Sequence, residues 1–285
     1  MNRNDITKKL YERKLAKEVL IAVHRGCGGG NIIENTIPAF EIALKYGGDI
    51  IEVDVAKSTD GKLYTIHEGQ EERLFFSKDN VQTLSSQEIE NLSYRNGNSF
   101  KVKQKVEELE EVLKHFRGDT LINLDRAWEF WDDVFELVKK WSMFDQIIVK
   151  SPVTEKYLDF MEQYEIPVMY IPIVKNEREL AQVLERNINT VGVEVIISSE
   201  KSDFYNLEII KELKKRNLLV WLNAIRLNDS TILTLGSDDD KALLLSEDDG
   251  WGRILDIGAD IIQTDWPLHL ACYLQKRRMF TNLNS

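Results

Sequence analysis

The sequence lacks several features that define common classes of protein. It has only two cysteines, Cys27 and Cys272, in 285 residues, which is too few for the disulfide framework of a small secreted domain. Its apolar runs, such as residues 191–197, are too short to cross a bilayer, so we expect no transmembrane segment. Residues 1–18 are polar and contain no apolar stretch typical of a secretion signal. We therefore expect a cytoplasmic protein.

An excess of positive charge is also absent. The chain has 37 Lys and Arg residues against 48 Asp and Glu residues, which gives a formal net charge of −11. Proteins that bind nucleic acids need a basic surface to neutralise phosphates, so we expect no nucleic-acid partner. A small phosphate-ester substrate would need local cations at its binding site instead, and a bound divalent metal ion supplies such charge.

Short apolar runs with strand character alternate with helical patterns along the chain, which is typical of β/α units around a parallel sheet. The predicted strands are residues 20–23, 49–55, 63–67, 120–125, 146–150, 168–173, 190–197, 218–223 and 260–264. The predicted helices are residues 37–46, 105–116, 130–141, 154–164, 177–186 and 206–216. This alternation predicts an α/β fold, a TIM (β/α)8 barrel that forms one domain over residues 1–285.

The sequence predicts nine strands, one more than an eight-stranded barrel needs. A turn signal explains the additional strand. The gap between the second and third predicted strands is too short for a crossover helix, and it contains Asp-Gly at positions 60–61. We therefore expect an additional β-hairpin after the second strand, which brings His67 close to Asp54. The polar residues 68–118 predict an insertion over one face of the barrel without a core of its own.

Polar residues stand at the ends of the apolar strands, and the C-terminal mouth of a TIM barrel carries the active groups. Glu52 and Asp54 lie two positions apart on one face of the second strand, and Asp125 ends a later strand. Three converging carboxylates repel one another unless a hard divalent cation binds them. His24 and His67 lack the spacing of a zinc-binding pair. We assign metal binding to the carboxylates and proton transfer to the histidines.

Ordinary structural roles remain open for other polar residues. A single histidine is usually a satisfied surface or core group, and this is our interpretation of His115 and His269. A carboxylate at the end of a strand often caps the next helix. Asp265, and Glu34 together with Asn35, fit that description.

The order of short motifs along the chain carries further information. These motifs are His24-Arg25-Gly26, Glu34-Asn35-Thr36, Glu52-Val53-Asp54-Val55, Thr59-Asp60-Gly61, His67, Trp221-Leu222-Asn223 and Thr264-Asp265-Trp266-Pro267. In residue type and spacing, residues 22–267 resemble the glycerophosphodiester phosphodiesterase family.

The resemblance implies a TIM-barrel hydrolase that uses Mg²⁺ or Ca²⁺. Such an enzyme converts a small glycerophosphodiester to sn-glycerol 3-phosphate and an alcohol. Carried over by position, His24 and His67 form the acid–base pair. The implied metal ligands are Glu52, Asp54 and Asp125, and the implied substrate-binding residues are Arg25, Trp221 and Asn223.

Three positions depart from the family pattern. Asp125 stands where the family usually has Glu, and Ala127 replaces a phosphate-facing Lys. Lys150 ends the next strand, and in one interpretation it supplies this charge. In an equal alternative, Lys150 is a surface lysine whose aliphatic stem lies along the protein and whose ammonium group reaches solvent. Glu68 follows His67 where the family commonly has Asp, which predicts a modified substrate pocket.

The expected mechanism needs one histidine as base and one as acid. The base removes a proton from the attacking hydroxyl, and the acid protonates the leaving alkoxide. Because Asp54 lies beside it, His67 is the acid in this interpretation. Two alternatives are a phospholipase D-like phosphodiesterase with cyclic phosphate products, which Asp125 fits, and a non-catalytic ligand-binding barrel of the same family, which Ala127 fits.

Overall fold

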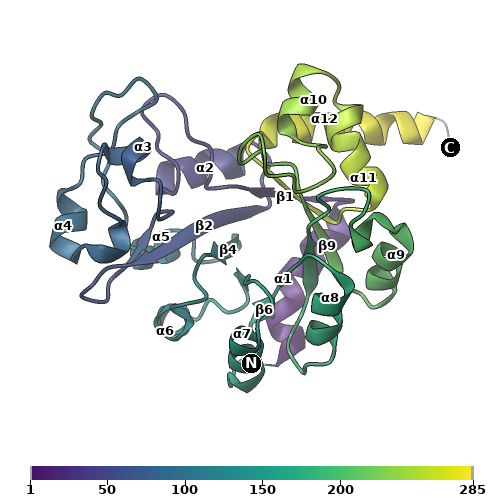
Figure 1. The fold of residues 1–285 in the computed structure, drawn as a ribbon, viewed down its shortest axis with the longest axis horizontal. Helices are drawn as coiled ribbons and strands as arrows, with labels where there is room; N and C mark the ends of the chain where they lie inside the picture. Colours follow the sequence, from purple (N-terminus) through teal and green to yellow (C-terminus); the bar gives the residue numbers. More distant parts are fainter. Residues whose placement is uncertain (1, 284–285) are drawn as a thin grey trace.

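The fold is a curled parallel sheet surrounded by helices, as Figure 1 shows for the computed structural model, which describes residues 2–283. The strands are β1 (Leu20–Val23), β2 (Ile50–Lys57), β3 (Leu63–Thr65), β4 (Leu121–Asp125), β5 (Ile147–Val149), β6 (Met169–Tyr170), β7 (Ile173–Val174), β8 (Gly192–Val195), β9 (Leu219–Asn223) and β10 (Ile261–Thr264). Each predicted strand overlaps an observed one.

Helices follow most of the strands, as an α/β barrel requires. They are α1 (Arg3–Ala16), α2 (Ile37–Lys45), α3 (Glu71–Phe75), α4 (Ser86–Asn91), α5 (Leu109–His115), α6 (Trp131–Trp141), α7 (Glu155–Gln163), α8 (Glu177–Leu184), α9 (Leu207–Lys215), α10 (Asp239–Leu244), α11 (Arg253–Ile257) and α12 (Pro267–Leu283). Single helical turns lie at Val81–Thr83, Asp203–Tyr205 and Asp248–Gly252. The six predicted helices correspond to α2 and α5–α9.

The strands pair in the order β6-β5-β4-β2-β1-β10-β9-β8-β7, and all neighbours on this path are parallel. Strand β3 lies off the path and pairs antiparallel with β2, with Val55 opposite Thr65. This antiparallel pair is the predicted hairpin, which is therefore confirmed. It extends the C-terminal end of β2 and directs the chain toward His67.

The predicted strand 168–173 is split around Pro172. Its first part, β6, pairs with β5, and its second part, β7, pairs with β8. Because proline has no backbone N–H, Pro172 cannot donate a hydrogen bond to a neighbouring strand. The two parts occupy one barrel position between them, so the path has the eight positions that the sequence predicts. A further bridge between Tyr170 and Thr190 links the two ends of the path.

Helix α1, which was not predicted, closes the N-terminal end of the barrel. Ile6 and Leu10 are fully buried in the main core. The guanidinium of Arg13 donates to the carbonyl oxygens of Asp49 and Asp119, which precede β2 and β4. Only three residues of this helix are buried, so its apolar face is too narrow to stand out in the sequence. The opposite, C-terminal mouth carries the polar strand ends.

A small second core, shared with neighbouring segments, packs against the insertion over residues 68–118. Its buried residues include Leu74, Phe75 and Tyr94, and the rings of the last two stack at 4.7 Å. The sequence did not show this core because part of it comes from outside the insertion. Tyr64 on β3 and Ile33 after β1 complete it.

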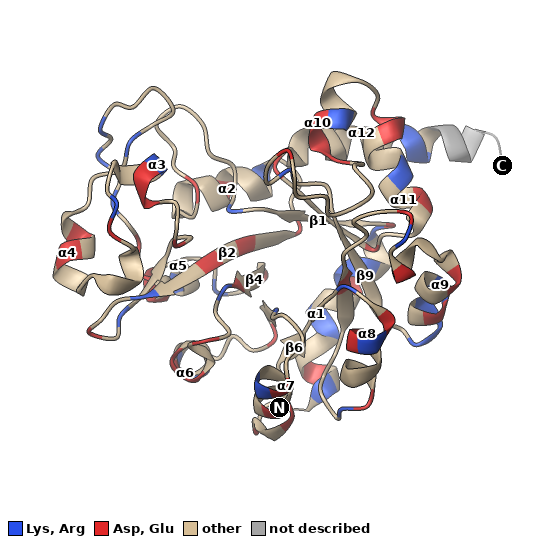
Figure 2. Ribbon diagram, in the orientation of Figure 1, with Lys and Arg blue, Asp and Glu red and all other residues tan. Residues whose placement is uncertain are grey.

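Charged residues of both signs are spread over the outer helices, for example α8 and α9, and acidic positions interrupt strand β2 (Figure 2). No helix in the described part of the chain is both long and apolar enough to cross a bilayer.

Candidate active site

Strands β1 and β10 place the first histidine beside a carboxylate. Their parallel register puts Val23 next to Thr264, so the residues that follow, His24 and Asp265, adjoin at the barrel mouth. His24 Nδ1 lies 2.9 Å from Asp265 Oδ1. Burial lowers the pKa of His24, but the carboxylates of Asp265 and Glu52 outweigh it and raise the pKa to about 9. A pKa of about 9 favours the protonated form of His24 at neutral pH.

The three predicted metal ligands come from adjacent strands. The register of β2 and β4 pairs Asp54 with Asp125, and Glu52 lies on the same face as Asp54. Burial, followed by the charge of Asp54, raises the pKa of Glu52 to about 8. Burial also raises the pKa of Asp125. The three carboxylates repel one another when ionised, and a bound hard divalent cation would relieve this repulsion.

The carboxylates as placed do not form a ready coordination shell. Among the residues that the structure describes, no group of three or more His, Cys, Asp or Glu side chains is arranged to hold a metal ion. Asp54 Oδ2 instead lies 2.9 Å from Arg25 Nε, although this contact lacks hydrogen-bond geometry. The backbone N–H of Arg25 donates to Glu52 at 2.8 Å. Arg25 is thus held against two of the three predicted ligands.

Asn35 fixes Asp54 from the other side. Its side-chain amide donates to Asp54 Oδ2 at 2.9 Å, and its Oδ1 accepts the backbone N–H of Asp54 at 3.0 Å. Glu34 accepts from Arg25 at 3.1 Å and from Arg73 at 2.6 Å. Neither Glu34 nor Asn35 caps helix α2, whose N-cap is Thr36. The helix-cap interpretation of this pair was wrong, and both residues support the site.

The hairpin positions the second histidine. Thr65 on β3 donates its hydroxyl to the carbonyl of Asn35 at 2.8 Å, which ties the hairpin to the loop after β1. Two residues later, His67 Nδ1 lies 2.5 Å from the carbonyl oxygen of Glu68. A carbonyl oxygen only accepts, so Nδ1 must carry a proton, and Nε2 is the ring nitrogen that this bond leaves unused.

The remaining predicted residues form one buried cluster inside the barrel. Lys150 Nζ lies 2.7 Å from Glu194 Oε2 and 3.4 Å from the centre of the Trp221 ring. Asn223 donates to Glu194 Oε1 at 2.7 Å, and the Trp221 indole N–H donates to Gln263 at 3.1 Å. The Lys150 side chain has 0% exposure, so the alternative of a surface lysine was wrong.

Sequence reasoning missed Glu194, although a signal was present. It is a single carboxylate inside the apolar run 191–197, and a charge in such a run needs a buried partner. Strand β8 places Glu194 beside Trp221 on β9. The cation that neutralises it, Lys150, comes from β5, and this pairing across the barrel is not visible in either strand alone.

A cavity of about 1010 Å³ opens over the two histidines. Its lining comes from the loop after β1, the insertion, the loop after β9 and the start of α12, and includes Arg25, Arg73 and Arg226. Four of its lining side chains are large, apolar and exposed by 43–50%. They are Tyr46, Leu227, Trp266 and Leu268. The cavity therefore combines charged lining residues with these four exposed apolar side chains, which we call its apolar rim.

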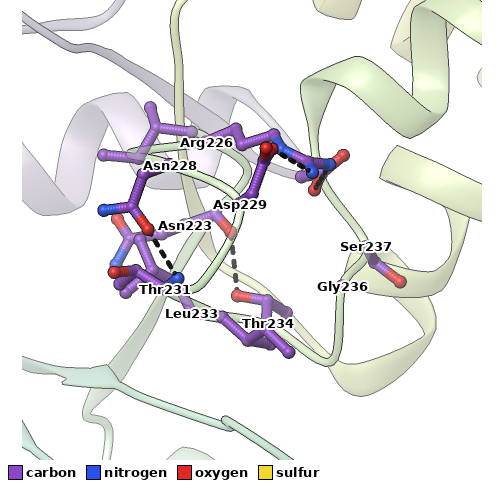
Figure 3. Close-up of a pocket in the computed structure, with 12 residues that line it drawn as sticks. Asn223, Arg226, Asn228, Asp229, Thr231, Leu233, Thr234, Gly236 and Ser237 are labelled. Atoms are coloured by element: carbon purple, nitrogen blue, oxygen red, sulfur yellow. Dashed lines mark hydrogen bonds and ion pairs between the residues drawn. The ribbon is translucent and has the colours of Figure 1, made fainter.

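A second cavity of about 170 Å³ lies within the loop after β9 and shares Arg226 and Asn228 with the larger one (Figure 3). Thr234 donates its hydroxyl to the carbonyl of Asn223 at 2.8 Å, and Asn228 accepts from the backbone of Thr231. These bonds fold the loop back onto the end of β9. They explain how the loop forms one wall of the main cavity.

Comparison with known proteins places the chain in a family. The family model for the glycerophosphoryl diester phosphodiesterase family matches residues 24–268. The Bacillus subtilis protein YqiK, which is uncharacterised, is 31% identical over 139 residues; this alignment covers 46% of the chain and 57% of YqiK, little more than half its length. Human lysophospholipase D GDPD1 is 24% identical over 291 residues, covering 93% of this chain and 89% of the human protein.

Solved structures show the same fold. The crystal structure of a glycerophosphoryl diester phosphodiesterase from Parabacteroides distasonis superposes with a TM-score of 0.74 and 20% sequence identity. The match covers 90% of this chain and 86% of the Parabacteroides chain. An Oleispira antarctica phosphodiesterase, in complex with the product sn-glycerol-3-phosphate, matches 90% of this chain and 96% of its own, with a TM-score of 0.63 and 15% identity. The predicted TIM-barrel fold is confirmed. With a family model that spans nearly all of the barrel, the chain belongs to the glycerophosphoryl diester phosphodiesterase family, whose named members are phosphoric diester hydrolases.

Proposed function

We propose that this protein is a metal-dependent phosphodiesterase that hydrolyses glycerophosphodiesters to sn-glycerol 3-phosphate and an alcohol. The observation that carries the proposal is the pair His24 and His67, which line one cavity. Nδ1 of His24 contacts a carboxylate, whereas Nδ1 of His67 contacts a carbonyl oxygen. The family membership and the product named for the Oleispira relative support this substrate class.

The donor set fits Mg²⁺ or Ca²⁺. Glu52, Asp54 and Asp125 offer hard oxygen ligands, and the repulsion that raises the pKa of Glu52 to about 8 is relieved when a cation is bound. A bound divalent ion supplies charge neutralisation to the phosphate oxygens. Arg25, held at the same carboxylates, lines the cavity and contacts the phosphate.

The two histidines take opposite roles. His67 donates its Nδ1 proton to the carbonyl of Glu68, so its Nε2 is free to accept a proton from the attacking hydroxyl. His24, protonated beside Asp265, donates a proton to the leaving alkoxide. This assignment reverses the one that the sequence favoured, because Asp265 lies beside His24 and the partner of His67 is a neutral carbonyl group.

The buried cluster of Lys150, Glu194, Trp221 and Asn223 lies inside the barrel and acts on the proposed metal ligands. The charge of Lys150 counters the rise in the pKa of Asp125, which keeps this ligand closer to its ionised form. Trp221 and Asn223 hold Lys150 and Glu194 in place. Direct contacts of Lys150, Trp221 and Asn223 with the substrate remain predictions.

The apolar rim supports a second candidate, a lysophospholipase D activity of the kind named for the human relative. Trp266, Leu268 and Leu227 could cover a single acyl chain, and each buried methylene group contributes about 0.8 kcal/mol. Monomeric lysophosphatidylcholines of increasing chain length test this candidate. A kcat/KM that rises with chain length, and a flat response in Leu268→Ser, would favour it over the short glycerophosphodiesters.

The main proposal is tested with glycerophosphocholine, glycerophosphoethanolamine and glycerophosphoinositol as substrates. We expect release of sn-glycerol 3-phosphate from at least one of them, and a loss of at least about 10³-fold in His24→Ala and His67→Ala. Cyclic phosphate products would instead identify the phospholipase D-like alternative. No turnover with any diester, by a folded protein that still binds sn-glycerol 3-phosphate, would identify the non-catalytic barrel.

A further inference from the structure

Arg126 is the first residue after β4 and follows directly on the proposed ligand Asp125. Its φ of 54° lies in the left-handed region, which residues other than glycine rarely adopt. Its backbone N–H donates to Asp125 Oδ1 at 2.7 Å. This turn leaves the guanidinium at the barrel mouth, where its side chain is 33% exposed.

Glu68 fixes the orientation of this guanidinium. Arg126 Nε donates to Glu68 Oε2 at 2.7 Å, and Nη2 donates to the other carboxylate oxygen. Such a two-point contact fixes the plane of the guanidinium as well as its position. Because the carbonyl of Glu68 also accepts from His67 Nδ1, the pair connects the end of β4 with the second histidine.

Arg126 differs from the other two cations near the carboxylates. Arg25 is shared between Asp54 and Glu34, and Lys150 is wholly buried against Glu194. Arg126 pairs with one carboxylate, and its Nη1 group donates to none of the residues that the structure describes. It is therefore the partly exposed cation with N–H groups left to donate to a ligand.

The electrostatics of the mouth call for a cation at this place. The backbone N–H of Arg126 donates to Asp125, which pairs with Asp54 across β4 and β2, so Arg126 stands beside both carboxylates. A phosphodiester that approaches these carboxylates carries a negative charge and meets their field. A guanidinium on the β4 side would hold a phosphate oxygen while Arg25 holds the β1 side.

We propose that Arg126, oriented by Glu68, binds a non-bridging oxygen of the substrate phosphate. This inference rests on the proposed function. Two departures from the family pattern then belong together, because Glu68 is long enough to hold Arg126 and Arg126 supplies the cation that Ala127 lacks. Arg126 is the residue that touches the substrate, and Glu68 is a positioning residue.

The test compares Arg126→Met, Arg126→Lys and the double variant Arg126→Met/Ala127→Lys with the parent enzyme. We expect kcat/KM for glycerophosphocholine to fall roughly a hundredfold in Arg126→Met. Binding of sn-glycerol 3-phosphate, measured by calorimetry in the presence of the divalent metal, should weaken in parallel. Added guanidinium ion, or the added Ala127→Lys substitution, should restore part of the activity. Arg186→Met is the matched control, because Arg186 is similarly exposed and pairs with carboxylates outside the site.

The Glu68→Gln variant distinguishes phosphate binding by Arg126 from a purely structural role of the Arg126–Glu68 ion pair. If Arg126 binds phosphate, Glu68→Gln should keep most of the affinity for sn-glycerol 3-phosphate and lose mainly kcat. Equal losses in Glu68→Gln and Arg126→Met, without rescue by guanidinium, would overturn the proposal. Failure of the parent enzyme to hydrolyse any diester would refute the proposed function instead, and the calorimetric comparison would still decide the role of Arg126.

Discussion

His24 and Asp265 form an ion pair at 2.9 Å, although 241 positions separate them in the chain. The parallel pairing of β1 with β10, the first and the last strand of the chain, creates this contact. The ion pair determines the protonation of the proposed acid. The pairing of the first and last strands is therefore linked to the chemistry of the site.

Replacing Asp265 by Asn should shift the alkaline limb of the pH–rate profile. His24 must be protonated to act as acid, so activity should fall as pH rises through about 9 in the parent enzyme. Without the carboxylate the pKa of His24 falls, and activity at pH 8.5 should drop about tenfold more than at pH 6.5. Glu41→Gln is the control, because Glu41 pairs with His115 at 3.0 Å on the surface. An unchanged alkaline limb in Asp265→Asn would remove His24 as the acid.

Asp239 should make the protein less stable as pH rises. Its carboxylate accepts hydrogen bonds from Trp251, Thr264 and the backbone of Asp265. Burial nevertheless raises its pKa from 3.8 to about 7. The folded state then binds the proton more tightly than the unfolded state, so the free energy of unfolding from this group falls between pH 4 and pH 7, by at most about 4 kcal/mol.

The contribution of Asp239 is the difference in the free energy of unfolding between the parent protein and the Asp239→Asn variant. Urea unfolding of the parent protein and of Asp239→Asn, from pH 4 to pH 8, isolates this group from all other carboxylates. We expect the parent protein to lose stability relative to the variant as pH rises. A difference that does not change with pH would contradict the raised pKa.

Lys150→Met should destabilise the fold by about 3–5 kcal/mol, because it leaves Glu194 buried without its cation. The double variant Lys150→Met/Glu194→Gln should recover most of this loss. The emission of Trp221, over whose ring the ammonium lies, should change in the single variant. Unaltered stability would contradict the buried ion pair.

The chain should unfold as one domain. The small core of the insertion shares Tyr64 and Ala56 with the hairpin that extends β2, so neither part is complete alone. We expect tryptophan emission and far-UV circular dichroism to give coincident unfolding curves. Two separated transitions would show that residues 68–118 form an independent unit.

The sequence predicted the barrel well because the β/α alternation is a local pattern. Each strand could be recognised from its own apolar run, and the Asp60-Gly61 turn predicted the hairpin that carries His67. The split of the predicted strand 168–173 around Pro172 was missed because pairing of one run with two different neighbours is a property of barrel closure.

Site residues were predictable at strand ends, while their partners were not. His24 and Asp54 follow from the register of single strands and the family motifs. Asp265, Glu194 and Arg126 gain their roles from contacts between distant segments. The local signal for Glu34 and Asn35 favoured a helix cap, and only the fold shows that they hold Arg25 and Asp54.

The most direct test of the account is the release of sn-glycerol 3-phosphate from glycerophosphocholine before and after EDTA treatment, with Mg²⁺ or Ca²⁺ added back. We predict that EDTA abolishes release, that one of the two ions restores it, and that Asp54→Asn responds to neither ion. Full activity in EDTA, or full activity in Asp54→Asn, would contradict the assignment of Glu52, Asp54 and Asp125 as metal ligands.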